Sequence, residues 1–398
     1  MLTLDKVYHA AYALKNVIRD TAVIQAPNIN PEADVYLKTE NLQITGSFKV
    51  RGAYYKISQL SAEEKKKGVI ACSAGNHAQG VALAATANGI KSLICLPDGA
   101  PISKVEATKS YGADVCLVKG VYDDAYAKAM ELKEEMGYTF IHPFDDVDVI
   151  AGQGTIGLEI LDQLPDLDAV IVPIGGGGLI SGVAFSIKSL NPKCKVYGVQ
   201  SEGAPSMYNS LKDEHICHLE NVKTIADGIA VKTPGDHTFE ICSQYVDEIV
   251  TVTDDEVASA ILALMEQQKL VSEGAGAVSV AAAMFNKVDV KGKKVCCLVS
   301  GGNIDVTILS RVISRGLLSS GRSLSIKIEL TDKPGQLEAV SKIVAGLGGN
   351  IVSIYHDRYD LNIDIVSCIL DLRIETRDHE HIKCIVDALK NEGFKIVE

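Results

Sequence analysis

The 398-residue chain has no tryptophan, and only 5% of its residues are aromatic. It also lacks an excess of basic residues, because 39 lysines and arginines stand against 51 aspartates and glutamates and give a formal net charge of −12. The lysines are spread along the chain and form no patch, so we expect no nucleic-acid partner. With 47% hydrophobic residues, the composition is that of a globular protein long enough for two or three domains.

The cysteines lack the paired spacings that mark disulfide frameworks or zinc sites. Ten cysteines occur without a C-x-x-C pair, and the chain begins without the basic and then apolar segment of an export signal. We therefore expect reduced thiols in a cytoplasmic protein. Cys296 and Cys297 fall in an apolar strand pattern and are expected to pack in a core. The segment from His215 to His218 has no second ligand pair at zinc-finger spacing, so we interpret it as a solvated loop and predict no metal site.

A membrane-spanning pattern is also missing. One uncharged run, residues 169–187, is long enough to span a bilayer. Pro173 and four successive glycines interrupt this run, so it is predicted to form a strand, a turn and a helix. We expect no membrane association.

Short apolar runs alternate with helical patterns from residue 34 to about residue 315. Near-continuous apolar runs are typical of parallel strands that are buried on both faces. The predicted strands are 69–72, 92–96, 115–118, 169–172, 196–199 and 295–299. This alternation predicts an α/β fold with two doubly wound lobes and a cleft between them.

A Gly- and Ser-rich segment at residues 315–324 separates a smaller C-terminal part. The pattern after it predicts a strand, a helix, two strands, a helix and a last strand, at 324–330, 334–347, on either side of 359–362, at 379–391 and at 394–397. This βαββαβ order is that of a ferredoxin-like unit. We predict one domain over residues 1–320 and a second over residues 325–398.

Residues 47–53 read Ser-Phe-Lys-Val-Arg-Gly-Ala and place Lys49 between Phe48 and Val50. Lysines are rarely buried without a reason, because removing the charge from water is costly. Taken alone, the segment fits a surface lysine in the first turn of a helix, with its stem along apolar neighbours. The choice between this interpretation and a lysine whose amine takes part in catalysis depends on other segments.

A glycine loop follows the strand predicted at 169–172. Consecutive glycines between a strand and a helix leave several backbone N–H groups free to point at one anion, whereas a tight turn needs only one or two glycines. The loop lacks the Lys-Ser/Thr of a nucleoside triphosphate site and is not a Gly-x-Gly-x-x-Gly fingerprint. It therefore predicts a site for a cofactor monophosphate, formed by Gly175, Gly176, Gly177, Gly178 and Leu179.

Two more polar segments follow predicted strands. Residues 73–80 open a helix and offer Ser73 and Asn76 for a carboxylate and a phenolic oxygen, while His77 by itself is more typical of a structural histidine. Residues 300–303 begin with the neutral hydroxyl of Ser300. Ligands of open α/β sheets bind at this carboxyl edge of the strands. A lysine, a phosphate cradle, an asparagine and a neutral hydroxyl are the parts that a pyridoxal phosphate site needs.

These segments, together with residues 226–229 (Ala-Asp-Gly-Ile) and 273–276 (Glu-Gly-Ala-Gly), resemble the tryptophan-synthase-like family of pyridoxal phosphate enzymes and, within it, the serine/threonine dehydratases. The resemblance covers nearly the whole chain and implies the two-lobed fold type II with pyridoxal 5'-phosphate as cofactor. The implied roles are Schiff-base lysine and catalytic base for Lys49, ring contacts for Phe48 and Gly228, 3-hydroxyl binding for Asn76, phosphate binding for Gly175 to Leu179, pyridine-nitrogen contact for Ser300, and substrate binding for Ser73, Ala74, Gly75, Asn76 and His77.

The resemblance implies a threonine ammonia-lyase that forms 2-oxobutanoate and ammonia from L-threonine and also converts L-serine to pyruvate. Serine racemases are similar as well, but they carry a serine acid/base where this chain has Ala74. Their divalent metal needs carboxylates in the region of residues 199–206, where only Glu202 is present. We therefore expect weak racemisation and no such metal. A serine-preferring dehydratase or racemase is the alternative, and a non-catalytic amino-acid sensor is another, which the intact Lys49 and glycine loop disfavour.

The C-terminal segment resembles an ACT regulatory domain. The residues that carry this resemblance are Asp332-Lys-Pro-Gly-Gln-Leu337 and Gly349-Asn350. It implies a small-molecule effector bound between paired copies, with isoleucine, valine and nucleotides as candidates. The resemblance to the dehydratase family implies a homotetramer built as a dimer of dimers. The implied binding residues are Asp332, Pro334, Gly335, Leu337 and Asn350. A dimerisation module without an effector is the alternative.

Overall fold

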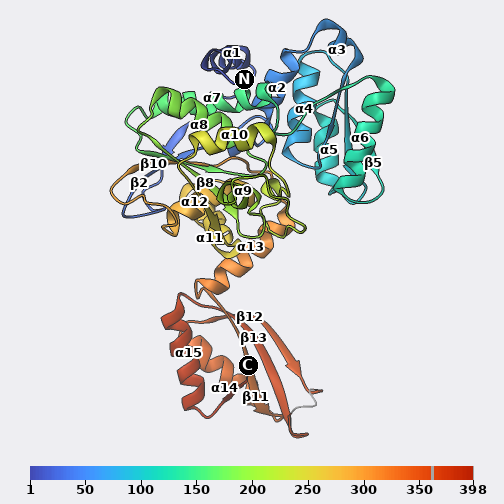
Figure 1. The fold of residues 1–398 in the computed structure, drawn as a ribbon. Helices are drawn as coiled ribbons and strands as arrows, with labels where there is room; N and C mark the ends of the chain where they lie inside the picture. The colour runs from blue at the N-terminus through green and yellow to red at the C-terminus, as the bar shows by residue number, and fades with distance from the viewer. Residues whose placement is uncertain (360–362, 398) are drawn as a thin grey trace. The chain divides into compact units, whose positions relative to one another are not determined.

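The apolar runs of the first 300 residues form the strands of two separate sheets (Figure 1). The computed structural model describes residues 1–359 and 363–397, and the chain divides into the units Met1–Ile308 and Leu309–Glu398. Both sheets belong to the first unit. The helix α13, Val306–Ser319, begins at the end of this unit and continues into the second.

The larger sheet has six strands in the order β1-β2-β10-β7-β8-β9. All neighbours are parallel except β1, which is antiparallel to β2. The bounds are β1 Val23–Gln25, β2 Asp34–Lys38, β7 Ala169–Pro173, β8 Lys195–Ser201, β9 Glu248–Val252 and β10 Lys294–Leu298. Every residue of β7 is buried, as are Cys296 and Cys297 in β10, so the prediction that these cysteines pack in a core is confirmed.

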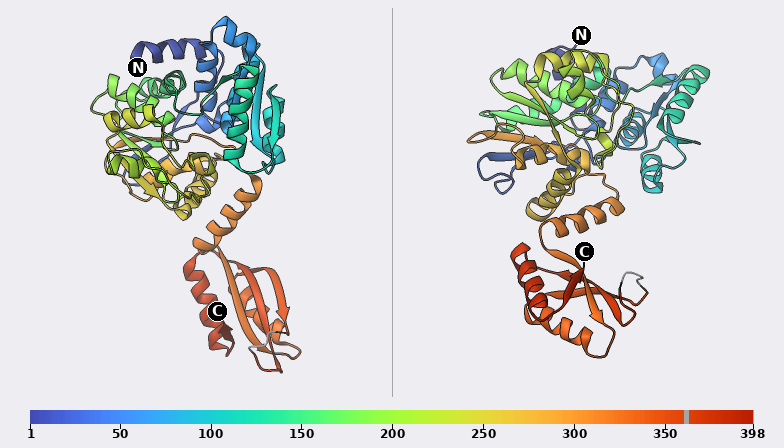
Figure 2. Two further views of the ribbon diagram at one scale, coloured as in Figure 1. Left: turned by 45° about the vertical axis from the view of Figure 1, so that its right-hand side comes forward. Right: turned by 60° about the horizontal axis from the view of Figure 1, so that its bottom comes forward.

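The smaller sheet has four parallel strands in the order β5-β4-β3-β6. They are β3 Val69–Cys72, β4 Ser92–Pro97, β5 Asp114–Val118 and β6 Thr139–Phe140. The expectation that the strand at 115–118 is buried on both faces is wrong: β5 lies at the sheet edge, and Leu117 is 54% exposed. An apolar sequence run therefore marks the strand but not its place in the sheet. Figure 2 shows this sheet and its helices as a lobe beside the larger sheet.

Helices cover both sheets of the first unit. α8 and α12 pack on strands of the larger sheet, and α4 and α6 pack on strands of the smaller one. The α-helices are α1 Leu4–Leu14, α2 Lys49–Ser58, α3 Ala62–Lys67, α4 Asn76–Ala87, α5 Ile102–Ser110, α6 Tyr122–Met136, α7 Val147–Gln163, α8 Gly178–Leu190, α9 Ser206–Lys212, α10 Asp236–Tyr245, α11 Asp254–Ala263 and α12 Gly274–Met284. The 3-10 helices η1 Glu40–Leu42 and η2 Asp227–Ile229 and the π-helix η3 Leu264–Gln268 are shorter. In the described part of the chain, no helix combines the length and apolarity that a membrane crossing requires.

The second unit contains one antiparallel sheet in the order β12-β13-β11-β14. Its elements after α13 are β11 Ser323–Thr331, α14 Gln336–Gly346, β12 Asn350–Asp357, β13 Ser367–Glu375, α15 His379–Asn391 and β14 Lys395–Val397. This is the βαββαβ order expected from the sequence, although residues 360–362 of the predicted connection lie outside the described residues. Alternating apolar residues such as Ile328, Leu370 and Leu372 form its core with α14 and α15.

Candidate active site

The polar segments of the first unit follow the carboxyl ends of parallel strands. β3 ends at Cys72 just before Ser73, β7 ends at Pro173 just before the glycine loop, and β10 ends at Leu298 just before Ser300. Parallel strands present these ends at one edge of their sheet, where the backbone groups of the following loops are free to bind a ligand. β3 belongs to the smaller sheet and β7 and β10 to the larger one, so the polar segments at these edges come from both sheets.

Lys49 is the first residue of α2 and is half-buried. Its Nζ donates a hydrogen bond to the backbone carbonyl of Pro143 at 2.8 Å and lies 5.3 Å from the centroid of the Phe48 ring. Burial lowers the pKa of the amine to about 8, although the negative charge of Glu273 acts in the opposite direction. The side chain is therefore not a solvated surface lysine, and its amine is partly neutral near pH 7.

The glycine loop joins β7 to the N-terminus of α8. Gly177 has φ +100, a conformation that favours glycine, and a Cβ at Gly176 would lie 2.5 Å from ring atoms of Phe144. Within the described residues, the backbone N–H groups from Gly175 to Leu179 make no hydrogen bond to a protein acceptor. Free amides at the positive end of a helix form a site for an anion such as phosphate.

A buried polar network extends from Asn76, the first residue of α4. Its Nδ2 donates to Oε1 of Glu273 at 2.7 Å, and its Oδ1 accepts a hydrogen bond from Asn303 at 2.8 Å. Burial raises the pKa of Glu273 to about 7, and the charge of Asp227 adds to this effect. The sequence motif contained Glu273, but its role was missed. The available signal was a single acidic residue at the start of an uncharged Ala/Gly-rich segment.

Ser300 and Gly228 lie beside the same network. Ser300 is buried, its Oγ donates weakly to the carbonyl of Ala275 at 3.4 Å, and its own carbonyl accepts the N–H of Phe48 at 3.1 Å. A Cβ on Gly228 would lie 3.1 Å from the Cβ of Ala275 and 3.5 Å from Oε1 of Glu273. The structure therefore brings these two predicted residues together with Lys49 and Asn76.

The segment from Ser73 to His77 contains both open and filled positions. Ser73 Oγ accepts the N–H of Gly75 at 3.2 Å, and no atom lies within 4 Å of the place where a Cβ of Gly75 would be, so this part of the loop adjoins open space. Ala74 is half-buried. The ring of His77 is buried, with Nε2 2.8 Å from the carbonyl of Ile141. Burial, assisted by the charge of Lys49, lowers its pKa to about 3, so the ring is neutral at pH 7.

A buried ion cluster anchors the helix that carries Lys49, and sequence reasoning missed it. Arg51 makes two hydrogen bonds to Glu40, at 2.8 and 2.9 Å, and two to Glu159, at 2.5 and 2.8 Å. The buried Nζ of Lys38 also contacts Glu159 at 2.6 Å. Although burial acts to raise the pKa of Glu40, Arg51 outweighs it and holds the pKa below its ordinary value. The only sequence signal was an arginine close to the predicted lysine.

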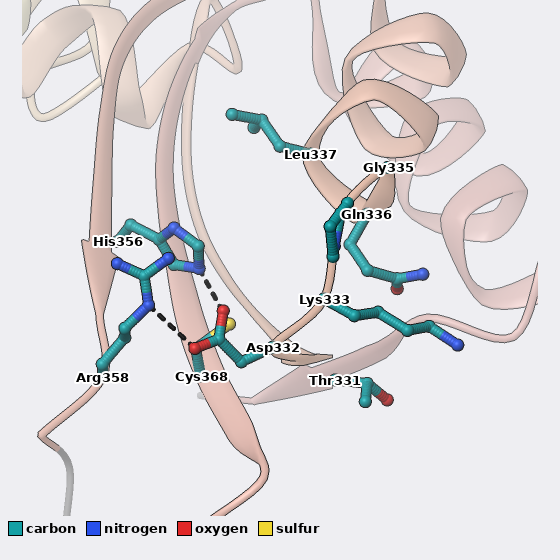
Figure 3. Close-up of a pocket in the computed structure, with 10 residues that line it drawn as sticks. Thr331, Asp332, Lys333, Gly335, Gln336, Leu337, His356, Arg358 and Cys368 are labelled. Carbon is teal, nitrogen blue, oxygen red and sulfur yellow. Dashed lines mark hydrogen bonds and ion pairs between the residues drawn. The ribbon is translucent and has the colours of Figure 1, made fainter.

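The predicted regulatory residues lie in the second unit and divide into two groups. Asp332, Pro334, Gly335 and Leu337 line a cavity of about 340 Å³ (Figure 3). Asn350 is not part of its lining, and its Nδ2 donates to Glu375 at 2.8 Å.

Comparison with known proteins identifies similar chains. A model of the family described as "Pyridoxal-phosphate dependent enzyme" matches residues 14–301. The L-threonine ammonia-lyase of Thermotoga maritima is 51% identical over 398 residues, which cover 100% of this chain and 99% of the relative.

Solved structures are similar over 78 to 80% of the chain. The processed form of threonine deaminase isoform 2 from Solanum lycopersicum has a TM-score of 0.74 and 39% identity, covering 78% of this chain and 94% of its own. Maize serine racemase has a TM-score of 0.75 and 34% identity, covering 80% of this chain and 98% of its own.

Proposed function

The chain belongs to the pyridoxal-phosphate dependent enzyme family, and from this premise we infer that it is an L-threonine ammonia-lyase. It converts L-threonine to 2-oxobutanoate and ammonia, and it also acts on L-serine to give pyruvate. The observation that carries this proposal is the half-buried amine of Lys49, with its lowered pKa, in a site that also contains a glycine loop with free amides. The 51% identity to a relative of that name over the whole chain supports the same substrate.

The residues of the site fit pyridoxal phosphate. In our proposal the amides from Gly175 to Leu179 bind its phosphate, because they have no protein acceptor among the described residues. Asn76 binds the 3-hydroxyl, and Lys49 forms the covalent link. Ser300 meets the ring nitrogen as a neutral partner, and Phe48 and Gly228 flank the ring. When bound, the cofactor supplies an electron sink for charge that develops at the substrate α-carbon.

Lys49 would act as the base once the amine of the substrate has displaced it from the covalent link. A lysine removes a proton only when it is neutral, and burial brings its pKa close to the operating pH. The N-terminal amides of α4 and the side chain of Ser73 hold the substrate carboxylate, which orients the α-proton toward the amine. Loss of the β-hydroxyl follows proton removal, and hydrolysis of the product gives the 2-oxo acid and ammonia.

Racemisation is the second candidate reaction, favoured by the similarity to maize serine racemase. It needs a proton donor on the opposite face of the α-carbon, and the methyl group of Ala74 has no proton to give. We therefore assign the chain to elimination. Incubation with L-serine should yield pyruvate, and chiral chromatography should find D-serine at a trace level. If D-serine formed as fast as pyruvate, the elimination assignment would be wrong and the protein would be a racemase.

The test of the proposed chemistry is a lysine substitution with a matched control. Lys49→Ala should remove both 2-oxobutanoate production and the visible absorption of the bound cofactor, while circular dichroism stays unchanged. Lys91→Ala replaces an exposed lysine of the same unit and should keep both properties. Normal turnover by the Lys49 variant would refute the proposed mechanism.

The effector, the oligomeric state and the cellular location are also part of the proposal. A small carboxylate effector binds the cavity of the second unit between paired copies, within a homotetramer, and shifts the threonine saturation curve by a coupling of about 1 to 3 kcal/mol. The location is cytoplasmic, in keeping with ten free cysteines. Removing the chain after Ser320 should abolish the shift and leave turnover. Indifference of the full chain to isoleucine, valine and nucleotides would leave only the dimerisation role.

A further inference from the structure

Three side chains in the second unit are of the kinds that bind transition metals. Asp332 follows β11, His356 is the next-to-last residue of β12, and Cys368 is the second residue of β13. One carboxylate oxygen, one ring nitrogen and the sulfur all lie within 4.8 Å of one another. Figure 3 shows the three side chains directed toward one point in the cavity that they line.

The strand register explains why these donors meet. β13 lies between β12 and β11, and Cys368 pairs with Leu330, which stands two residues before Asp332. His356 pairs with Leu370, so it is the diagonal neighbour of Cys368 on the same face of the sheet. The His356 Nε2 and the Cys368 Sγ are 2.8 Å apart. Two donors are thus fixed by the sheet, and the third comes from the loop beside it.

We propose that Asp332, His356 and Cys368 bind a divalent transition-metal ion of the zinc class and leave one coordination position open to the cavity. Thiolate and imidazole ligands select zinc-like ions, whereas magnesium and calcium prefer sites made of oxygen. Three protein ligands with a fourth, exchangeable position form a common tetrahedral arrangement. As the sulfur–metal bond forms, the S–H bond breaks and the proton passes to solvent.

The hydrogen bonding of Asp332 agrees with this proposal. The Nε of Arg358 donates to Oδ2 of Asp332 at 2.9 Å. Such an outer hydrogen bond orients a ligand in metal sites.

This site is distinct from the divalent metal considered in the sequence analysis, which concerned residues 199–206 of the first unit. It would share its cavity and Asp332 with the proposed effector site. The sequence carries no hint of it, because the three donors are far apart and belong to no zinc-finger spacing. The tertiary structure alone brings them within reach of one ion.

Equilibrium dialysis with zinc tests the proposal on the full-length, cofactor-loaded protein after treatment with a chelator and a thiol reductant. The wild type should bind one zinc ion per chain more than Cys368→Ser or His356→Gln. Because loss of an outer partner alone typically weakens a metal site about 10- to 100-fold, loss of a ligand should weaken binding at least about 10-fold. Cys217→Ser is the matched control, since Cys217 lies near His215 in another loop, and it should bind like the wild type.

Cobalt provides a second readout that reports the sulfur ligand directly. Cobalt added to the wild type should give a thiolate-to-metal absorption band that is absent from Cys368→Ser. Subtracting the spectrum of that variant removes the absorption of the cofactor. Asp332→Asn, a change at an exposed position, should weaken binding without unfolding the unit, as judged by circular dichroism. Equal zinc stoichiometry and affinity in the wild type and in Cys368→Ser would overturn the proposal.

Discussion

The lowered pKa of Lys49 predicts how the cofactor-free protein takes up pyridoxal phosphate at different pH values. Only the neutral amine can form the covalent link, so the uptake rate follows the neutral fraction. With a pKa of about 8, roughly one Lys49 in ten is neutral at pH 7. An ordinary lysine with a pKa of about 10.4 would be neutral in roughly one chain in 2,500. We therefore expect the site to accelerate uptake at pH 7 about 250-fold through this effect alone.

The dependence of the uptake rate on pH distinguishes a lysine with a lowered pKa from an ordinary lysine. For a pKa of about 8, the rate should rise about ninefold from pH 6 to 7, about fivefold from pH 7 to 8, and less than twofold from pH 8 to 9. Stopped-flow absorbance of the bound cofactor measures the rate. A blocked lysine derivative, measured in parallel, corrects for the titration of the cofactor itself. A rate that still rises about sevenfold from pH 9 to 10, as expected for an ordinary lysine with a pKa of about 10.4, would refute the burial argument.

Glu273→Gln tests the electrostatic part of the same reasoning. The carboxylate of Glu273 raises the pKa of Lys49, so its removal should move the plateau of the profile to lower pH. The amide oxygen of glutamine can still accept the hydrogen bond from Asn76, which keeps the network in place. An unchanged midpoint in this variant would show that the charge of Glu273 does not act on Lys49.

Three further results are expected. Gly176→Ala places a Cβ 2.5 Å from the Phe144 ring and should weaken cofactor binding measured by dialysis, whereas Gly99→Ala, with no atom within 4 Å of its Cβ, should not; equal affinities would contradict the role of the loop. Arg51→Met leaves the buried charge of Glu40 without its main partner and should lower the free energy of unfolding by about 3 to 5 kcal/mol in urea titrations; a loss below about 1 kcal/mol would refute this. Because the folded pKa of Glu40 lies below its unfolded value of 4.5, its stabilisation is present above that pH and is lost as the pH falls through the folded pKa, so the difference between wild type and Arg51→Met should narrow in acid.

Much of the fold follows from local patterns. The apolar run of 169–172 became β7, and the pattern of 379–391 became α15 with the expected bounds. The strand at 115–118 shows the limit of such patterns, because its apolar residues are the same whether it lies inside a sheet or at its edge. Edge position depends on which strands pair, and pairing is not local.

The sequence by itself determined the segments that carry the chemistry. Few other functions combine, in this order, a lysine between apolar residues, polar residues after strands and a run of four glycines. Only the tertiary structure decided which groups share a site. Glu273 modifies the pKa of Lys49, and Arg51 pairs with Glu40 and Glu159, through contacts between residues far apart in the chain. In the second unit, the register of β12 and β13 places Cys368 beside His356. Charges and ligands interact through space over a few ångströms. The separation of two residues in the sequence predicts their distance in space only when both lie in the same helix, strand or turn.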